Sequence, residues 1–372
     1  MVGALTLDRL LYVDKYPKPD SKSSCTSREC GGGNAANTAC CIGNLCLGSP
    51  IDYEIQLLSK VSTDQVGKGL CDELIHSNVN LSSPLFIRCD GKSSVSTVIV
   101  TCDESHTRTC IFDPGTVGTL NCSDVEGIDY DALFHLVKIL HSDTRHTDAA
   151  VRLAREAKRR GIRISIDVER DRNSKEFDEL IDLADIVFTG EDLMQRIVQR
   201  RWPQMIFSAA HDFSVAVAQL CHQLSIMTNN QTDKELIVTR GEKGAWHCKL
   251  MRYINLNEDS KVVDIDRFQY VLRNVGSARD VNVVDTTGAG DSFIGGFLFA
   301  SQLLLPIDGN VLTDQEKIMF QLRFASWVAA RKISGHGARG CLPTWHSVEI
   351  HLGSTVKIIS EMLKLKIRCG ES

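Results

Sequence analysis

The stretch Val-Asp-Thr-Thr-Gly-Ala-Gly-Asp-Ser-Phe, residues 284–293, lies between a short apolar run and a long helical pattern. Its small residues let the backbone approach a ligand closely, and the first amides of a helix have no partners within that helix. Free amides and the helix dipole together attract phosphate. Asp291 can then accept a proton from a hydroxyl that attacks this phosphate. We therefore predict a phosphoryl-transfer site, with Asp291 as base and the amides of Gly288, Ala289 and Gly290 as an anion hole.

A second stretch, Gly-Gly-Gly-Asn-Ala-Ala-Asn-Thr-Ala at 31–39, precedes an alanine-rich helical run. Asn34 and Asn37 are three residues apart and share one helix face. Amide side chains both donate to and accept from sugar hydroxyls. Taken alone, each of the two stretches has a simpler interpretation. The first could be a tight turn at a helix N-terminus, and the second a glycine-rich turn with an asparagine cap.

Strand-like and helical patterns alternate along most of the chain. This order predicts a mainly parallel sheet covered by helices. The clearest strand candidates are 54–60, 162–168, 186–188, 236–239 and 245–248, and helical patterns cover 176–183, 204–225, 290–304 and 313–333.

Two segments, 9–30 and 94–112, break this alternation, and a third segment, 249–280, shows no clear periodicity. Residues 94–112 predict two strands with a turn at Asp103–His106, and together with residues 9–30 they could form a small separate sheet. Residues 249–280 carry mixed charge without periodicity, which predicts an insertion or a long loop.

Composition excludes several classes of protein. The 372 residues carry a formal charge of −5, which gives no basic footprint for nucleic acid. The most basic stretch, 152–163, fits the solvated face of a helix. The chain has no run of 18 apolar residues, and its start does not resemble a secretory signal. These features predict a soluble cytoplasmic protein without membrane contacts, whose cysteines are reduced thiols and lack zinc-site spacing.

Other phosphate-binding motifs fail on inspection. Gly91-Lys92-Ser93 could end a Walker A loop, but Phe86 stands where that loop needs its first glycine. The chain also lacks a strand followed by Gly-x-Gly-x-x-Gly, and it has no His-Arg-Asp and Asp-Phe-Gly pair of a protein kinase. A P-loop or dinucleotide enzyme is therefore excluded.

Both glycine-rich stretches resemble the two signatures of the ribokinase-like (pfkB) carbohydrate kinase family, and they occur in that family's order. The similarity extends over nearly the whole chain, and within the family it is strongest to ketohexokinase and to uncharacterised plant-type pfkB carbohydrate kinases. It rests further on VDKYPKPDSK (13–22), TRTCI (107–111), IDVER (166–170) and ADIVF (184–188). The resemblance implies one domain, 1–372, folded as a three-layer α/β/α sandwich with a central, mainly parallel sheet and a small β lid at about 9–30 and 94–112.

The same resemblance implies the roles of individual residues. Substrate hydroxyls would be held by Asp8, Gly32, Gly33, Asn34 and Asn37, Arg108 would reach from the lid toward the transferred phosphate, and Thr239, Gly241 and Gly244 would form the nucleotide-binding turn. Without the resemblance, Asp8 is a loop acid, Arg108 an exposed strand cation and the turn a surface hairpin.

The sequence also departs from the family's pattern. An Asn-x-x-Glu motif that helps to organise Mg²⁺ is absent, and Glu191 or Asp192 could substitute for it through water. Asp285 and Thr287 match a monovalent-cation site of some relatives, but Cys341 stands in place of a serine that often completes it. A thiol is a poor ligand for K⁺, which argues against activation by K⁺. Relatives have several residues before Val2, so the first strand is expected to be truncated.

We therefore expect an ATP- and Mg²⁺-dependent kinase of a small sugar, with a ketohexose-like substrate favoured. A nucleoside kinase of the same family and a catalytically weak scaffold protein are the alternatives. The resemblance also implies a possible homodimer in which the lids of two subunits clasp each other. Its contact would include Val98 and Val100, or Thr97 and Ile99 if the register is reversed.

Overall fold

The computed structural model describes most of the chain. The described residues are 1–51, 53–105, 107–201, 203, 213–226, 234–250, 260–265, 268–278, 281–304 and 312–353.

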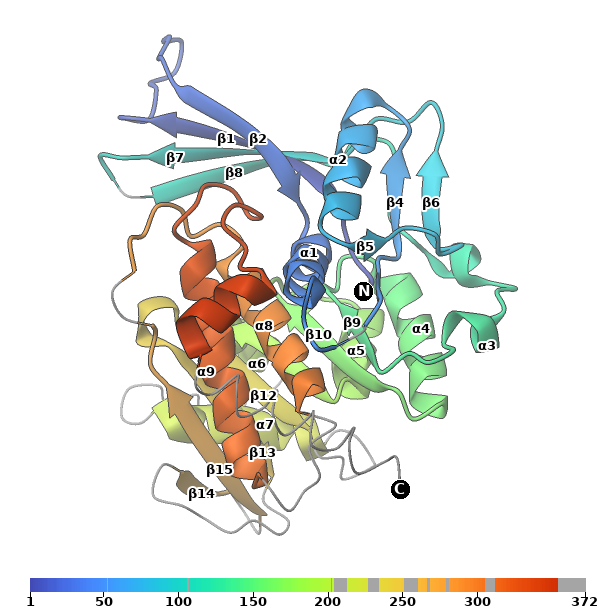
Figure 1. The fold of residues 1–372 in the computed structure, drawn as a ribbon, viewed down its shortest axis with the longest axis vertical. Helices are drawn as coiled ribbons and strands as arrows, with labels where there is room; N and C mark the ends of the chain where they lie inside the picture. Colours follow the sequence, from blue (N-terminus) through green and yellow to red (C-terminus); the bar gives the residue numbers. More distant parts are fainter. Residues whose placement is uncertain are drawn as a thin grey trace.

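The described residues form a central seven-stranded sheet in the order β14-β15-β13-β12-β11-β10-β9 (Figure 1). In chain order its strands are β9 (Ile139–Ser142), β10 (Arg163–Val168), β11 (Ile186–Gly190), β12 (Glu235–Thr239), β13 (Ala245–Leu250), β14 (Lys261–Ile265) and β15 (Phe268–Val275). Strands β9 to β12 are parallel neighbours, whereas β13, β15 and β14 add an antiparallel edge. The parallel half confirms the expected α/β class, because parallel strands need crossover connections, which here are helical.

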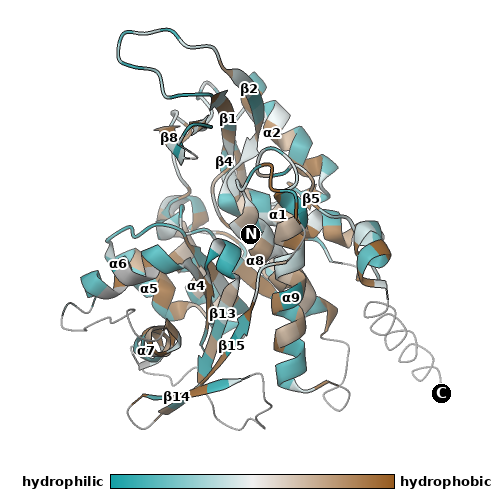
Figure 2. Cartoon of the chain, turned by 90° about the vertical axis from the view of Figure 1, so that its left-hand side faces the viewer, coloured by the Kyte–Doolittle hydropathy of each residue, from teal (hydrophilic) through white to brown (hydrophobic). Residues whose placement is uncertain are grey.

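Helices cover both faces of this sheet, as two views at right angles show (Figures 1 and 2). One face packs against α1 (Asn34–Cys46), α8 (Ala289–Leu303) and α9 (Asp314–Lys332), and the other against α4 (Thr147–Arg159), α5 (Lys175–Leu183), α6 (Glu191–Arg201) and α7 (Phe213–Ile226). Side chains of β11 alternate between the two cores: Ile186 and Phe188 face α8, and Val187 faces the opposite layer. The three-layer sandwich is thereby confirmed.

A second sheet of four strands, ordered β2-β1-β7-β8, lies outside the sandwich at the top of Figure 1. Its strands are β1 (Thr6–Val13), β2 (Thr26–Gly32), β7 (Ser96–Cys102) and β8 (Thr107–Asp113). The two segments predicted to break the alternation thus pair with each other, through a parallel contact between β1 and β7. The strand register shows which side chains share a face of this sheet. Ile99 is buried beside Leu10, whereas Val98 and Val100 lie on the other face and are partly exposed.

Smaller elements connect these parts. They are β3 (Ile55–Gln56) paired with β5 (Val79–Asn80), β4 (Ser59–Ser62) paired with β6 (Phe86–Cys89), α2 (Gln65–His76), α3 (Tyr130–Leu133) and the 3₁₀ turns η1 (Cys122–Val125) and η2 (Gly241–Lys243). Val2 forms isolated parallel bridges to Leu58 and Ser142, so an extended N-terminal segment lies beside β9.

The prediction of an insertion or long loop at 249–280 is wrong where the structure describes that range. Residues 261–265 form β14 and residues 268–275 form β15, and β15 pairs with β13 inside the central sheet. Tyr270, Val271 and Leu272 are fully buried, so this strand lacks the alternation that marks a half-exposed one. The remaining predicted strands and helices lie close to observed elements, except that 204–212 falls outside the described residues.

Two surface features follow the sequence. Ala150, Val151, Ala154 and Ala157 of α4 are buried, so the basic residues of this helix form its solvated face. In the part of the chain that the structure describes, no helix combines the length and apolar character needed to span a bilayer.

Candidate active site

Asp291 lies in the first turn of α8, directly after the left-handed Gly288. Gly288 has a φ of 75°, and a Cβ there would lie 2.7 Å from the Cα of Ala338, so only glycine fits. The amide of Ala289 already donates to the carbonyl of Thr286 at 3.1 Å. Among the described residues, the amides of Gly290 and Asp291 have no main-chain acceptor. These two amides therefore remain available to an anion in this structure.

Helix α1 brings Asn37 to the carboxylate of Asp291. The Asn37 amide donates to Oδ2 of Asp291 at 2.8 Å, and the Thr38 hydroxyl donates to the main-chain oxygen of Asp291 at 3.3 Å. The close approach of the helices depends on small residues, since a Cβ on Gly295 of α8 would lie 2.8 Å from the Cys41 thiol of α1. The alanine- and cysteine-rich face of α1 is thus what places the asparagine side chain against the aspartate.

The glycines before α1 pack closely against β1 and the residues that precede it. Gly33 has a φ of 94°, and a Cβ there would lie 2.1 Å from the carbonyl oxygen of Ala4. A Cβ on Gly32 would lie 2.2 Å from Oδ2 of Asp8 on β1. Asp8 is buried and its Oδ1 accepts a hydrogen bond from the Thr6 hydroxyl at 3.0 Å. The second sequence stretch therefore makes tight backbone contact with the first strand.

Arg339 links these parts, and the sequence reasoning missed it. Its Nε donates to Oδ1 of Asn37 at 3.1 Å, and its Nη2 donates to the carbonyl oxygen of Gly32 at 3.0 Å. Its Nη1 donates to Oε2 of Glu73 at 2.9 Å, and the Gly31 amide donates to the same oxygen at 2.9 Å. The guanidinium thus fixes both the asparagine and the glycine turn. The only signal in the sequence was the glycine-rich setting of Gly-Ala-Arg-Gly at 337–340.

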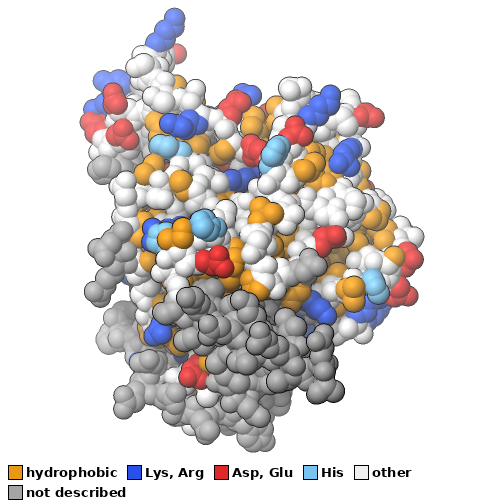
Figure 3. All heavy atoms as spheres, viewed as in Figure 1, with side chains coloured by type: hydrophobic (Ala, Val, Ile, Leu, Met, Phe, Trp, Pro, Cys, Tyr) orange, Lys and Arg blue, Asp and Glu red, His pale blue; other side chains and the backbone are white. Residues whose placement is uncertain are grey.

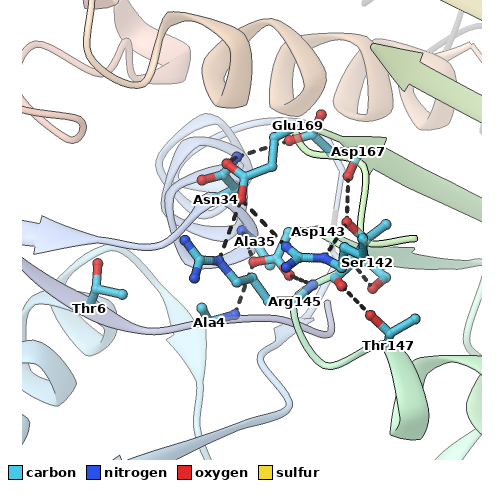
Figure 4. Close-up of polar contacts among 12 residues, drawn as sticks. Ala4, Thr6, Asn34, Ala35, Ser142, Asp143, Arg145, Thr147, Asp167 and Glu169 are labelled. Atoms are coloured by element: carbon cyan, nitrogen blue, oxygen red, sulfur yellow. Dashed lines mark hydrogen bonds and ion pairs between the residues drawn. The ribbon is translucent and has the colours of Figure 1, made fainter. Parts of the chain in front are cut away.

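A group of acidic residues from the ends of β9 and β10 faces α1 (Figure 4). The Asn34 amide donates to Oδ2 of Asp167 at 3.1 Å and to Oε2 of Glu169 at 2.8 Å. Asp143 accepts main-chain hydrogen bonds from Ala4 at 2.9 Å and Ala35 at 3.2 Å. Asn37 therefore meets the predicted Asp291, whereas Asn34 meets two carboxylates, Asp167 and Glu169, that were not predicted.

Burial dominates the electrostatics of this group. It raises the pKa of Asp291 to about 7; the Asn37 amide opposes this rise, and the charges of Glu169, Asp143 and Asp8 add to it. Burial likewise raises the pKa of Asp8 to about 6. Burial and the nearby Asp291 hold the pKa of Asp167 well above its usual range. A carboxylate whose pKa lies near neutrality is suited to take up and release a proton.

The loop before Asp291 is held by Asp285. Its Oδ1 accepts the Thr287 amide at 2.8 Å, and its Oδ2 accepts the Gly337 amide at 2.8 Å and the Tyr12 hydroxyl at 3.3 Å. Burial raises the pKa of Asp285, but these hydrogen bonds and the charge of Lys332 outweigh burial and lower it. The buried ammonium of Lys332 donates to the carbonyl oxygen of Asp285 at 3.0 Å. A protein cation, which the sequence did not reveal, therefore lies beside Asp285, one of the two residues that match the monovalent-cation site of some relatives.

The predicted nucleotide turn follows β12 at the carboxyl edge of the sheet. Gly241 and Gly244 have φ values of 54° and 83°, and a Cβ on Gly244 would lie 1.9 Å from the carbonyl oxygen of Val275. Beside this turn, Glu191 forms a two-point ion pair with Arg240, at 2.9 and 3.1 Å. The carboxylate expected to substitute in a metal site therefore has a protein cation as its partner.

Arg108 lies on β8, in register with Thr101 of β7 and Tyr12 of β1. Paired residues share a sheet face, so Arg108 lies on the same face as Tyr12, which contacts Asp285. Its side chain is exposed. Hydrogen bonds thus join Asp291, Asn37, Arg339 and the Gly32 carbonyl, and the charge of Asp8 acts on Asp291. Among the described residues, Arg108 and the nucleotide turn form no hydrogen bond with this group.

Comparison with known proteins agrees with this arrangement. The family model described as pfkB family carbohydrate kinase matches residues 1–345. Ketohexokinase of Mus musculus is 23% identical over 347 residues, 91% of this chain and 97% of the relative. A protein of Halopiger xanaduensis named ATP-dependent ribose-1-phosphate kinase is 23% identical over 298 residues, 80% of this chain and 82% of the relative.

Solved structures show the same fold. The ribokinase structure from Giardia lamblia has a TM-score of 0.74 and 18% identity, and the match covers 95% of this chain and 98% of that one. With its sequence matched by the family model over nearly its whole length, the chain belongs to the pfkB family of carbohydrate kinases.

Proposed function

We propose that this protein phosphorylates a hydroxyl of a small sugar with ATP, and that Asp291 is the catalytic base. The observation that carries the proposal is the Asn37–Asp291 hydrogen bond of 2.8 Å. It joins the helix of the glycine-asparagine stretch to α8, in whose first turn the amides of Gly290 and Asp291 have no main-chain acceptor among the described residues. A sugar held by the asparagine face would therefore present its hydroxyl beside a base and an anion-binding helix end.

The reaction follows from these positions. Asp291 removes the hydroxyl proton as the sugar oxygen forms a bond to the γ-phosphorus of ATP. The bond from that phosphorus to the β,γ-bridging oxygen breaks, and ADP leaves with the electron pair. Asn37 occupies Oδ2 of Asp291 and so directs Oδ1 to the hydroxyl. The amides of Gly290 and Asp291, together with the helix dipole, stabilise the charge on the transferred group.

Mg²⁺ would enter with ATP, whose phosphates it neutralises. In the described residues, no three His, Cys, Asp or Glu side chains converge into a metal site. Mg²⁺ bound to phosphates often needs only one or two carboxylates from the protein. The side chains are compatible with this mode of binding but do not form a dedicated metal cage.

The four-stranded sheet is proposed to act as a lid of a single kinase domain. Asp8 and Tyr12 lie on one face of β1 and contact the glycine turn and the Asp285 loop, respectively. Val98, Val100 and Ile111 lie on the other face, where Ile111 is 59% exposed. Charged side chains of both signs surround this sheet at the top of Figure 3. A second lid could cover the apolar centre of this face in a homodimer, as the family resemblance implies.

A reducing compartment suits the cysteines, because those that the structure describes are free thiols. We propose a cytoplasmic location on this basis.

The decisive experiment measures ADP release from purified protein with ATP, Mg²⁺ and a panel of ketoses, aldoses and nucleosides. We expect turnover with a sugar and loss of that turnover in Asp291→Asn. Preferential turnover of a nucleoside would favour a nucleoside kinase. Absence of Asp291-dependent turnover across the panel would contradict the proposal.

A further inference from the structure

Two arginines that the mechanism does not use lie beside the substrate-binding asparagine. Arg145 follows β9 and Arg172 follows β10, which are adjacent parallel strands. Both guanidiniums approach the same oxygen, Oε1 of Glu169, at 3.4 Å from Arg145 and 3.6 Å from Arg172. The other oxygen of Glu169 accepts the Asn34 amide at 2.8 Å. A single residue, Glu169, therefore links the two arginines to Asn34, the predicted sugar contact.

Neither ion pair is a tight one. Among the described residues, neither guanidinium forms a hydrogen bond with Glu169; Arg172 has only a 3.4 Å hydrogen bond from Nε to the Thr144 hydroxyl. Its Nη2 is buried without any hydrogen-bond partner. Burying a charged donor without a hydrogen-bond acceptor costs free energy. Natural proteins therefore seldom leave such a donor unless a ligand or function requires it.

Charge neutralisation alone does not explain this arrangement. Most other arginine–carboxylate pairs among the described residues are shorter, and some of them are two-point contacts. Arg155 meets Glu179 with two hydrogen bonds of 2.6 Å, and Arg200 meets Asp178 at 2.7 and 3.2 Å. Arg145 and Arg172 instead share one oxygen loosely. The charges of Asp143 and Asp8 also act on Arg145, so what this arrangement leaves unused is hydrogen-bond donors, most of which have no acceptor in Glu169.

The backbone around Arg145 is firmly held. The Arg145 amide donates to Oδ1 of Asp143 at 2.9 Å, and Oδ2 of Asp143 accepts the amides of Ala4 and Ala35. The guanidinium lies over the ring of Phe112, 4.8 Å from its centroid. Phe112 stands on β8 opposite Thr97, which stands opposite Asp8 on β1, so all three share one sheet face. Arg145 therefore faces the same space as Asp8.

We propose that Arg145 and Arg172 form an anion subsite for a substrate that is a sugar bearing a phosphate ester or a carboxylate. Its hydroxyls contact Asn34 and Asp291, and its oxyanion replaces the loose contacts to Glu169 with the planar, two-point geometry that arginine offers to such groups. The inference rests on the proposed kinase function and narrows its substrate class. It differs from the expectation of a neutral ketohexose.

The test compares matched sugar pairs on the full chain. The pairs are ribose with ribose 5-phosphate, fructose with fructose 6-phosphate, and glucose with gluconate. Calorimetry measures binding, and ADP release measures turnover. We expect the anionic member of at least one pair to bind about 10-fold or more tightly, the typical effect of charge-assisted hydrogen bonds. Preference for the phosphates or for gluconate identifies which oxyanion is recognised.

Variants then assign the effect to the arginines. Arg145→Met and Arg172→Met should each lower the affinity ratio of anionic to neutral sugar by about 10- to 100-fold. Arg172→Lys should restore only part of this ratio, because an ammonium lacks the two-point geometry. Arg155→Met, on the solvated face of α4, is the matched control. If Arg172→Met fails to fold in a thermal melt, Arg145→Met, at the more exposed position, decides the question.

The outcomes separate this inference from the proposed function. Equal or tighter binding of neutral sugars, with the ratio unchanged in both arginine variants, overturns the anion subsite while Asp291-dependent turnover preserves the kinase. Arginine-dependent binding of an anionic sugar without Asp291-dependent turnover supports the subsite and rejects the proposed reaction.

Discussion

Replacing Asp291 with asparagine should abolish most activity and yet stabilise the protein. The folded-state pKa of Asp291 is about 7, against a usual value of 3.8. A raised carboxyl pKa means that the folded state prefers the protonated form. Its contribution to stability is full below pH 3.8 and is lost as the pH rises through about 7. Asparagine does not titrate and avoids this loss.

The magnitude follows from the same values. At 1.36 kcal/mol per pH unit, the difference between pKa values of 3.8 and about 7 corresponds to about 4 kcal/mol at pH 8 and to between about 1 and 2 kcal/mol at pH 5. Unfolding entropy of about 2.1 cal/mol/K per residue over 372 residues converts 1 kcal/mol to about 1.3 °C. Asp291→Asn should therefore raise Tm by about 5 °C at pH 8 and about 2 °C at pH 5. Its kcat should fall by about 100-fold or more, as for other lost general bases.

Differential scanning fluorimetry at pH 5 and pH 8 measures the change in Tm. Asp192→Asn, at an exposed position, is the control. An ADP-release assay on a substrate of the wild-type protein measures the change in kcat. A Tm change that is negative or independent of pH would refute the buried-charge argument. Normal turnover in the variant would refute the assignment of the base.

Three further changes test the surrounding structure. Asn34→Ala should weaken sugar binding by about 1–3 kcal/mol, because the Asn34 amide is proposed to lie on the sugar side of the site. Calorimetry should show nearly unchanged ATP affinity. Loss of ATP binding with intact sugar binding would mean that the positions of the sugar site and the ATP site are exchanged. Arg339→Met should lower both the free energy of unfolding and kcat, because Asn37 and the Gly32 carbonyl lose the donor that they share. Arg339→Lys should restore neither quantity. Full activity of the Arg339→Met variant counts against a positioning role for Arg339. Val98→Asp combined with Val100→Asp should yield monomers in light scattering, and a wild-type monomer with full activity at micromolar concentration excludes the lid clasp.

The sequence was most informative where local chemistry and position coincide. Gly288 and Gly33, beside Asp291 and Asn34, are required by close backbone approaches, so these positions mark the site without any knowledge of the fold. The two strands of 94–112 were predictable because a turn separates two β-branched runs.

Contacts between distant segments were not predictable in this way. Arg339 meets Asn37, and Lys332 meets Asp285, only after the helices have packed. Neither residue stands in a motif that predicts its partner. Strand β15 was missed because it is buried on both faces and follows a charged segment, so it shows no alternation. Such interactions are set by tertiary packing, to which local patterns are blind.

The parallel pairing of β1 with β7 has a consequence for how the protein is made. Strands β1 and β2 are near in sequence, but residues 14–95 separate β1 from β7. During synthesis the hairpin of β1 and β2 emerges first, with the hydrogen-bonding edge of β1 open until β7 leaves the ribosome. Open edges invite pairing with other chains, and non-local strand pairs form slowly. A nascent chain halted before Ser96 is therefore expected to depend on chaperones, and the substrate-facing sheet matures only after α1 and α2 have been synthesised.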